Sequence, residues 1–257
     1  MNRVVLARYR EPLDWIKLIP DDFEVIIYNK GDKIEAPGIQ QRASQIIDRP
    51  NEGRESETYL HHMLTNVRDD DGFTVYAQAG PFEHSPDFIG LLHTRKSWAD
   101  LQPMSWQWLS EKNVPPPLLL SEYERGLFGR PRVRLERFSL LTWGPIDFID
   151  QGAWGMGNVY RAIHGLPEGA NIASHFLDLA GLDDLAAEAE RHMVGVFSYG
   201  AIFAVRNSRV ASIPSASIDI LRKLSVSGAV YGYILERLWL HFFGERFTLP
   251  KLAPQPL

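Results

Sequence analysis

Short apolar runs alternate with helical patterns over the first hundred positions of the chain. Strand-like runs cover 4–9, 24–28 and 73–77, and the second run is apolar almost throughout. A strand buried on both faces of a parallel sheet has this composition. Between the runs, apolar residues at helical spacing predict helices over 13–19 and 53–67. This order predicts an α/β fold, with a mostly parallel central sheet flanked by helices and joined by right-handed crossovers.

The second half of the chain has a less regular pattern. We interpret residues 98–170, which carry five tryptophans and a run of three prolines, as long loops and short helices over the binding edge of the sheet. Beyond them the pattern predicts a helix over 180–193, a strand over 194–205 that a glycine interrupts, and helices over 218–224 and 229–243. The sequence shows neither an internal repeat nor an inter-domain linker, so we expect a single domain over 1–257.

Composition places the chain among ordinary globular proteins, with 45% hydrophobic and 23% charged residues. The net charge of −5 argues against a broad basic surface for nucleic acid, although the 27 Lys and Arg residues suffice for a local basic cleft. Cysteine is absent, which excludes disulfides, thiolate zinc sites and cysteine nucleophiles. The sequence shows no apolar run of the roughly 20 residues that cross a bilayer and no signal-peptide layout, so we expect a cytoplasmic protein.

Polar residues gather where the first two predicted strands end. Arg8, Tyr9 and Glu11 follow the first strand, and Asn29 and Lys30 follow the second. In an open α/β sheet, ligands bind in the crevice beyond the carboxyl ends of the strands, so we expect a binding site here. Tyr9 is a candidate for stacking on a base. Glu11 either binds the ligand or caps the following helix.

Arg54 is the strongest single candidate. It occupies the first turn of a predicted helix, where the helix dipole favours anions, so the cation needs another reason to be there. Binding of phosphate groups is one such reason, and an ion pair with Glu55 or Glu57 is the structural alternative. Asn51 precedes the same helix and joins the candidate site.

Two further carboxylates are candidates for a catalytic base. Gln78, Glu83 and His84 follow the third predicted strand, where Glu83 would serve as a base or bind hydroxyl groups and His84 would contact phosphate. Glu236 lies on a mostly apolar helix near the C-terminus, and partial burial there would suit it to the same role. An ion pair with a neighbouring arginine is the alternative. We place Glu236 first and Glu83 second.

The adjacent His61 and His62 are weak candidates for metal ligands. On a helix they point about 100 degrees apart and cannot chelate one ion as an i, i+4 pair could. We expect one to face the sheet and the other to face solvent. A metal-dependent hydrolase that uses them with His84 therefore has poor spacing.

Five blocks of sequence, taken in order, resemble a known group of proteins. The blocks are Val5-Leu6-Ala7-Arg8-Tyr9 with Glu11 and Trp15; Ile27-Tyr28-Asn29-Lys30-Gly31; Asn51 with Gly53-Arg54-Glu55 and Thr58-Tyr59-Leu60; Val75-Tyr76-Ala77-Gln78 with Gly80-Pro81 and His84; and Gly200-Ala201-Ile202-Phe203-Ala204-Val205 with Leu235-Glu236-Arg237-Leu238-Trp239 and Phe243-Gly244. Together they resemble glycosyltransferase-like proteins of uncharacterised function whose fold is of the GT-A type. The resemblance covers both ends of the chain and leaves its centre unassigned.

The resemblance implies transfer of a sugar from a nucleoside diphosphate sugar, with UDP as the first candidate, to a hydroxyl acceptor. Residues 1–97 would form a Rossmann-like half that binds the nucleotide sugar, and residues 98–257 an acceptor-binding half. At the end of the first strand, Arg8 and Tyr9 would receive the base and ribose, while Arg54 would bind the diphosphate.

The sequence departs from the GT-A pattern at the usual metal site. GT-A enzymes often hold a divalent cation with an Asp-x-Asp pair at a strand end, but here the matching strand runs into Gln78-Ala79-Gly80. Asp69-Asp70-Asp71 precedes its strand and is interpreted as a solvated turn. The sequence therefore leaves two alternatives, one without and one with a Mn²⁺ or Mg²⁺ cofactor. Either cationic side chains and helix amides neutralise the diphosphate, or Glu83 and His84 form a non-standard metal site.

The acceptor is a glycan or, as the second choice, a hydroxymethylated base in phage-type DNA. Tryptophan faces in the centre of the chain would stack on a sugar ring or on a base. The same region carries a basic cluster of Arg125, Arg130, Arg132, Arg134 and Arg137, which Glu122, Glu124 and Glu136 partly neutralise. The alternative of a different class is a non-catalytic nucleotide- or carbohydrate-binding protein on a degenerate transferase fold, which the missing Asp-x-Asp pair favours.

Overall fold

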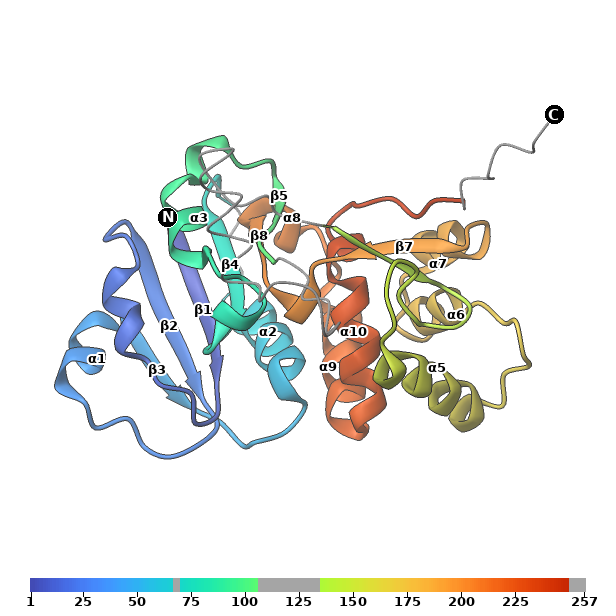
Figure 1. Cartoon of the computed structure of the whole chain (residues 1–257), viewed down its shortest axis with the longest axis horizontal. Coiled ribbons are helices and arrows are strands. Elements are labelled where there is room, and N and C mark those ends of the chain that lie inside the picture. The colour runs from blue at the N-terminus through green and yellow to red at the C-terminus, as the bar shows by residue number, and fades with distance from the viewer. Residues whose placement is uncertain (67–69, 106–134, 250–257) are drawn as a thin grey trace.

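The computed structural model describes residues 1–66, 70–105 and 135–249. Figure 1 shows a sheet on one side of the molecule and a helical part on the other. The strands are β1 Asn2–Arg8, β2 Phe23–Asn29, β3 Gln45–Asp48, β4 Phe73–Gln78, β5 Leu101–Pro103, β6 Glu136–Ser139, β7 Val194–Phe197 and β8 Phe203–Arg206. The α-helices are α1 Pro37–Arg42, α2 Arg54–Thr65, α3 Phe88–His93, α5 Gln151–His164, α6 Ile172–Leu179, α7 Asp183–Glu190, α8 Asn207–Ala211, α9 Ser215–Ser227 and α10 Ala229–Phe242. Short 3-10 helices are η1 Asp14–Leu18, η2 Pro81–Glu83, η3 Arg95–Ser97 and η4 Tyr199–Ala201.

The central sheet has six strands in the order β3-β2-β1-β4-β8-β5. β1 pairs in parallel with β2 and β4, and β3 pairs in parallel with β2. β8 runs antiparallel to both of its neighbours, β4 and β5. The predicted α/β fold with a mostly parallel sheet flanked by helices is thus confirmed. Strand order reverses at β1, because the chain adds β2 and β3 on one side and then β4 on the other, which creates a topological switch point.

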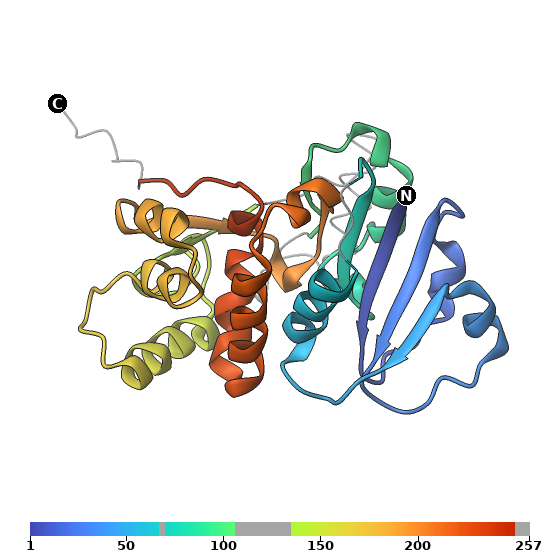
Figure 2. The ribbon, with the colours of Figure 1, turned by 180° about the vertical axis from the view of Figure 1, so that it is seen from behind.

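Each face of the sheet has its own hydrophobic core. Successive side chains of a strand point to opposite faces. Val5 accordingly packs in a cluster with Tyr59 of α2 and Leu235 of α10, whereas Val4 and Leu6 pack in a second cluster with η1 and α3. Figure 2 shows α2 lying against the sheet beside α9 and α10. Burial on both faces explains why the first two strands have apolar central segments, at 4–7 in β1 and 25–28 in β2.

Helix α10 lies between the sheet and the helical part, which comprises α5, α6, α7 and the β6–β7 pair (Figure 1). Trp143 is fully buried and donates its indole N–H to the carbonyl oxygen of Tyr233 on α10 at 3.0 Å. Asp150 caps α5 by accepting from the Ala153 amide at 3.0 Å, and it also accepts from Arg237 of α10 at 2.9 Å. The helical part is therefore joined to α10 by polar as well as apolar contacts.

Left-handed backbone conformations shorten one predicted element and divide another. The helix predicted over 180–193 is present as α7 and begins only at Asp183, after Gly181 at φ 67°, whereas α6, which ends at Leu179, was not predicted. The strand predicted over 194–205 is two strands in different sheets, because Gly200 and Ala201 take φ values of 69° and 56°. The chain reverses at these positions, and no regular pattern continues across them.

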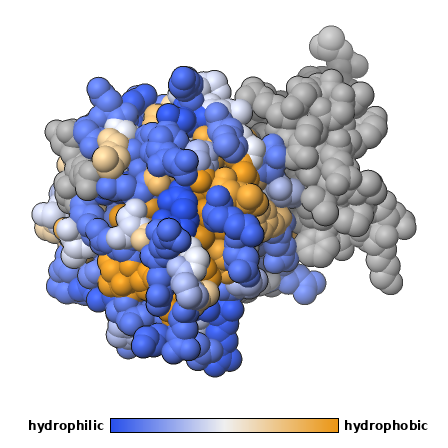
Figure 3. All heavy atoms as spheres, turned by 90° about the vertical axis from the view of Figure 1, so that its left-hand side faces the viewer, coloured by the Kyte–Doolittle hydropathy of each residue, from blue (hydrophilic) through white to orange (hydrophobic). Residues whose placement is uncertain are grey.

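Three other expectations also change. The helix predicted over 13–19 is the 3-10 helix η1, and the loop-rich interpretation of 98–170 misses the 14-residue helix α5. Strand β3 was also missed: it is a short edge strand whose end residues Gln45 and Asp48 are exposed. Figure 3 shows the side of the molecule on which α1 and β3 lie. This side is largely hydrophilic, with some hydrophobic side chains among the polar ones. Within the described ranges, none of the helices combines the length and hydrophobicity that a bilayer-spanning helix requires.

Candidate functional site

A cavity of about 490 Å³ opens at the carboxyl ends of β1 and β4, at the switch point of the sheet. Its size lies within the range of about 300–1,000 Å³ typical of small-molecule sites. Most of the residues that the sequence singled out line this cavity, namely Arg8, Tyr9, Glu11, Lys30, Asn51, Arg54, Gln78, His84 and Glu236. Asn29 and Glu83 do not belong to the lining.

Asn29 positions Arg8. It is buried, and its Oδ1 accepts from Arg8 Nη1 at 2.6 Å while its Nδ2 donates to Asp48 at 2.9 Å. Arg8 also donates to the carbonyl oxygens of Glu11 at 3.0 Å and Asp32 at 2.9 Å. Within the described part of the chain, no acceptor faces Arg8 Nη2. That nitrogen is available to a ligand, while the rest of the guanidinium is fixed by the protein.

The turn after β1 is held by Glu11. Its Oε2 accepts from the backbone amides of Tyr9 at 2.7 Å and Arg10 at 3.0 Å. The alternative that Glu11 caps the following helix is wrong, because η1 has no side-chain cap and the Glu11 carboxylate holds the preceding turn instead. The Tyr9 side chain is 40% exposed at the cavity, with the Arg10 guanidinium 4.8 Å from its ring centre. Tyr9 presents an aromatic face that a base could cover.

The ammonium group of Lys30 is fully occupied by partners within the protein. Its Nζ donates to the carbonyl oxygens of Glu52 and Arg54, both at 2.6 Å, and lies 3.1 Å from Glu57 Oε2. Glu57 also accepts from Arg49 at 2.5 Å. Burial alone would raise the pKa of Glu57, but the hydrogen bond from Arg49 and the charge of Lys30 hold this pKa below its ordinary value. All three ammonium donors have acceptors, so Lys30 fixes the loop before α2 instead of offering a free cation.

Arg54 projects from a tight turn at the start of α2. Gly53 and Arg54 both have left-handed backbones, with φ values of 59° and 52°. The guanidinium is exposed and lies 5.2 Å from the ring centre of Tyr233. No acidic side chain of the described residues forms an ion pair with it, and Glu57 pairs with other cations. Arg54 thus forms no close ion pair with Glu55 or Glu57. Burial would lower its pKa, but the charge of Glu55 and a hydrogen bond to Tyr233 raise it, so Glu55 acts on the guanidinium from a distance.

Glu236 joins α10 to the strand ends. Its Oε1 accepts from the Gly200 amide at 3.0 Å, and its Oε2 lies 3.5 Å from Arg237 Nη1. Gln78 at the end of β4 donates to the carbonyl oxygen of Gly200, also at 3.0 Å. The Gly200 residue is thereby tied to both elements. The alternative of an ion pair with Arg237 is present, and the Glu236 side chain is still 19% exposed in the cavity.

His84 faces the cavity as a neutral ring. Burial lowers its pKa, against the opposing charges of Glu83 and Glu236. Its ring packs edge-on against Tyr199, with centroids 4.8 Å apart. Its buried Nδ1 has no hydrogen-bond partner in the described part of the chain. A buried polar atom without a partner costs free energy, so this nitrogen destabilises the fold. The exposed Glu83 precedes His84 on η2 and lies outside the lining.

Besides Ala7, four lining residues were not singled out from the sequence, namely Glu55, Tyr199, Gly200 and Tyr233. Burial raises the pKa of the Glu55 carboxyl group, and the nearby charge of Glu236 adds to this effect. Burial likewise raises the pKa of Tyr199 to about 12. In the sequence, Glu55 was considered only as a partner for Arg54. No local signal marks the other three, because they reach the cavity through the packing of η4 and α10.

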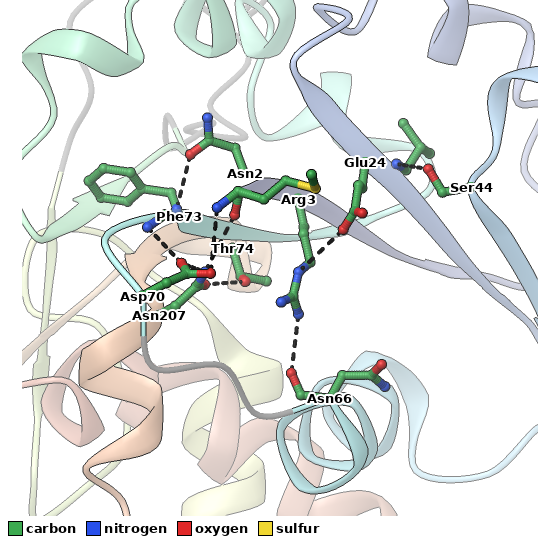
Figure 4. A network of polar contacts seen from close by, with 12 residues as sticks. Asn2, Arg3, Glu24, Ser44, Asn66, Asp70, Phe73, Thr74 and Asn207 are labelled. Carbon is green, nitrogen blue, oxygen red and sulfur yellow. Dashed lines mark hydrogen bonds and ion pairs between the residues drawn. The ribbon is translucent and has the colours of Figure 1, made fainter.

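The acidic turn at 70–71 precedes β4 and therefore lies at the end of that strand opposite to the cavity. Asp70 accepts from the Gly72 amide at 2.7 Å and from Asn207 at 2.6 Å, and Asn207 accepts from Thr74 at 2.7 Å (Figure 4). The hydrogen bond from Asn207 lowers the pKa of Asp70. The interpretation as a simple solvated turn is therefore incomplete, because Asp70 holds α8 to β4. Asp69 lies outside the described residues.

The two helical histidines differ as expected. His62 is buried, with its Nδ1 3.0 Å from the hydroxyl of Tyr28 and its Nε2 3.4 Å from Arg3. His61 is partly exposed. Within residues 1–66, 70–105 and 135–249, no group of three or more His, Asp or Glu side chains is arranged to hold a metal ion.

The tryptophans and arginines proposed for acceptor binding are only partly described. Trp98 and Trp143 are 9% and 0% exposed and belong to the core, so they are not stacking surfaces, whereas Trp154 on α5 is 53% exposed. Arg137 pairs with Asp147, 2.9 Å from its Nε. The remaining candidates lie outside the described residues, namely Trp106, Trp108, Arg125, Arg130, Arg132 and Arg134.

Known proteins provide no relative from which to infer a function. No protein-family model matches the chain, and neither the curated proteins nor the solved structures contain a significant match to it. Its chemistry must therefore be inferred from the residues that line the cavity at the switch point.

Proposed function

We propose that this chain is a glycosyltransferase of the GT-A type, which transfers a sugar from a nucleoside diphosphate sugar to a hydroxyl acceptor. UDP is our first choice of nucleotide. The observation that carries the proposal is the cavity at the switch point, where Arg8, Arg54 and Glu236 meet from three elements. Nucleotides bind at this position in open α/β sheets.

The cationic side chains of the cavity suit a diphosphate. Among the described residues, Arg54 offers a guanidinium that is in no close ion pair, and Arg8 offers a guanidinium that the protein holds through its Nε and Nη1. Guanidinium groups bind phosphate oxygens through paired hydrogen bonds, which makes them well matched to this role. The Tyr9 ring, beside Arg8, supports a place for the base. The nucleotide would thus lie across the ends of β1 and α2.

Glu236 is our candidate for the catalytic base. It would accept the proton of the acceptor hydroxyl as that oxygen bonds to the anomeric carbon and the bond to the diphosphate breaks. A base in this position accelerates such a reaction by about 10²–10⁴-fold. The hydrogen bond from the Gly200 amide fixes the carboxylate and leaves part of it facing the cavity. A glycan is our first choice of acceptor and a modified DNA base our second.

The first test is a thermal-shift screen of UDP-, GDP-, CMP- and dTDP-sugars, each with Mn²⁺ and with EDTA. A ligand that binds only the native state raises the melting temperature through mass action. We expect a UDP-sugar to raise it, and Arg54→Ala to weaken the affinity about 10- to 100-fold through loss of a charge-assisted bond. Arg191→Ala, an exposed arginine of the helical part, is the matched control and should leave the affinity unchanged.

Two results would contradict the proposal in different ways. If no nucleotide shifts the melting temperature, the donor site is absent. If a nucleotide binds but wild-type protein releases no UDP with any hydroxyl acceptor, the chain is a binding protein on a degenerate fold. For an enzyme, Glu236→Gln should abolish UDP release while the affinity for UDP remains close to that of the wild type.

A further inference from the structure

A second carboxyl group, Glu55, enters the cavity beside Glu236. Glu55 comes from the first turn of α2 and Glu236 from α10, and both line the same space. The two groups are held differently. Glu236 has one oxygen on the Gly200 amide and the other near Arg237, whereas the Glu55 side chain has only a long contact of 3.4 Å from the hydroxyl of Ser56.

No cation of the described residues forms an ion pair with Glu55. Lys30 is occupied by two carbonyl oxygens and Glu57, and the Arg54 guanidinium lies over the ring of Tyr233. The hydroxyl of Tyr59, one turn further along α2, is buried with no hydrogen-bond partner in the described ranges. Glu55 thus lines the cavity without an ion pair of its own, although the charges of Arg54 and Lys30 act on it from a greater distance.

These surroundings favour a neutral carboxyl group at Glu55. Burial raises its pKa, and Glu236 raises it further, while the Glu55 backbone amide, Arg54 and Lys30 oppose this change. A carboxyl group that keeps its proton can donate a hydrogen bond, while the neighbouring Glu236, held by the Gly200 amide and beside Arg237, is placed to accept one. The pair would offer one O–H donor and one carboxylate acceptor to the same ligand.

We propose that Glu55 is a sugar-binding residue, whose carboxyl group donates a hydrogen bond to one hydroxyl group of a sugar while Glu236 accepts from another. This inference rests on the proposed glycosyl transfer and identifies a hydroxyl-rich ring as the group held between α2 and α10. Neighbouring hydroxyl groups of a sugar both donate and accept, and so match a pair of this composition.

The test compares Glu55→Gln and Glu55→Ala by calorimetry with UDP and with the UDP-sugar that stabilises the wild type. The glutamine amide can still donate a hydrogen bond, so its affinity for the UDP-sugar should stay within about 3-fold of the wild type. Alanine leaves a hydroxyl group unpaired and should weaken the UDP-sugar roughly 10-fold. Neither variant should change the affinity for UDP, which lacks the sugar. Glu188→Gln, a buried carboxylate that accepts from the Phe247 amide at 3.1 Å, controls for loss of a buried carboxylate elsewhere.

The pH dependence of the affinity for the UDP-sugar provides a second test. A purely structural role of Glu55 would leave this dependence the same in wild type and in Glu55→Gln. Wild-type affinity for the UDP-sugar should fall as rising pH ionises Glu55, because the pair then loses its donor and gains a second negative charge. Glu55→Gln should remove this fall. Among the other groups at the cavity, burial lowers the pKa of His84 and raises that of Tyr199 to about 12, and Glu55→Gln leaves both in place, so that it removes the contribution of Glu55 alone.

The outcomes separate the two proposals. If UDP does not bind wild-type protein, the proposed function fails and this inference fails with it. If UDP binds but Glu55→Ala binds the UDP-sugar as tightly as the wild type does, only the inference on Glu55 is overturned. A pH dependence in Glu55→Gln equal to that of the wild type would overturn it as well, because another group would then carry the titration.

Discussion

Gly200 is the residue on which the geometry of the cavity depends most directly. Its amide and carbonyl groups are bound by Glu236 and Gln78, and its φ of 69° lies in the left-handed region. A Cβ atom at this position would lie 2.6 Å from Cδ2 of His84. Both the conformation and the contact therefore require a glycine, and any side chain here would displace a ring that faces the ligand.

We expect Gly200→Ala to lower the free energy of unfolding by about 1–3 kcal/mol, because alanine is strained in this conformation. Gly155→Ala is the control, since that glycine lies within α5 and a Cβ there meets nothing within 4 Å. Alanine should stabilise this helix by about 0.5–1 kcal/mol. Urea unfolding of both variants measures the contrast, and an unchanged midpoint for Gly200→Ala would contradict the role of this turn.

Among elements, the loop that leads into α2 depends on a buried ion pair. Lys30, from the end of β2, binds two carbonyl oxygens of the loop and the Glu57 carboxylate one turn into the helix. Strand, loop and helix are thereby joined at one ammonium group. The left-handed turn at Gly53 and Arg54, which directs the exposed guanidinium, lies between these anchor points.

We expect Lys30→Met to destabilise the protein by about 3–5 kcal/mol, because it leaves Glu57 buried with only Arg49 as a partner. Lys30→Met combined with Glu57→Leu should be less destabilised than the sum of the two single changes, since the double variant no longer contains the buried Glu57 carboxylate that Lys30→Met leaves with Arg49 alone. A double-mutant cycle by urea unfolding measures this coupling. Additive effects would show that the pair does not hold the loop.

The elements that the sequence predicted are those whose pattern reflects burial on the sheet. β1, β2, β4, α2 and the two C-terminal helices follow from apolar runs and helical spacing, because tertiary packing and local pattern agree there. β3 was missed because an edge strand with polar ends carries little hydrophobic signal. α5 was missed because Gly152, Gly155 and Gly157 lower its apparent helix propensity.

The candidate site was predictable where a single element presents a side chain at a strand end. Arg8 and Gln78 follow directly from the strand-end rule, and both reach the cavity. Glu83 follows the same strand but lies on η2 outside the lining, because the chain turns away at Pro81. Glu55 and Tyr233 could not be found this way, since their positions depend on how α2 and α10 pack together.

At the scale of the whole molecule, α10 connects the helical part to the cavity, because its residues contact both. Arg237 is fully buried and bridges Asp150 at the start of α5 to Glu236, with its guanidinium 4.7 Å from the ring centre of Phe197. Two regions of the chain thus share one buried cation. A change on the far side of α10 should therefore affect both folding and the carboxylate that faces the ligand.

We expect Asp150→Ala to lower the free energy of unfolding by about 3–5 kcal/mol, because it leaves Arg237 poorly paired and removes the cap of α5. It should also reduce UDP release, although Asp150 does not line the cavity. Asp184→Ala, an exposed position in the first turn of α7, is the control and should change stability by less than about 1 kcal/mol. Equal effects of the two substitutions would contradict the bridging role.

The placement of β8 has a consequence for synthesis of the chain. β8 lies between β4 and β5, so β5 at Leu101–Pro103 has no partner strand until Phe203–Arg206 has been made. At about 5–20 residues per second, the intervening hundred or so residues take roughly 5–20 s to translate. During that interval a nascent chain carries the open edge of β4, and such edges pair readily with other chains. The order of the strands thus makes the edge of β4 a site that has to be protected while the chain is being made.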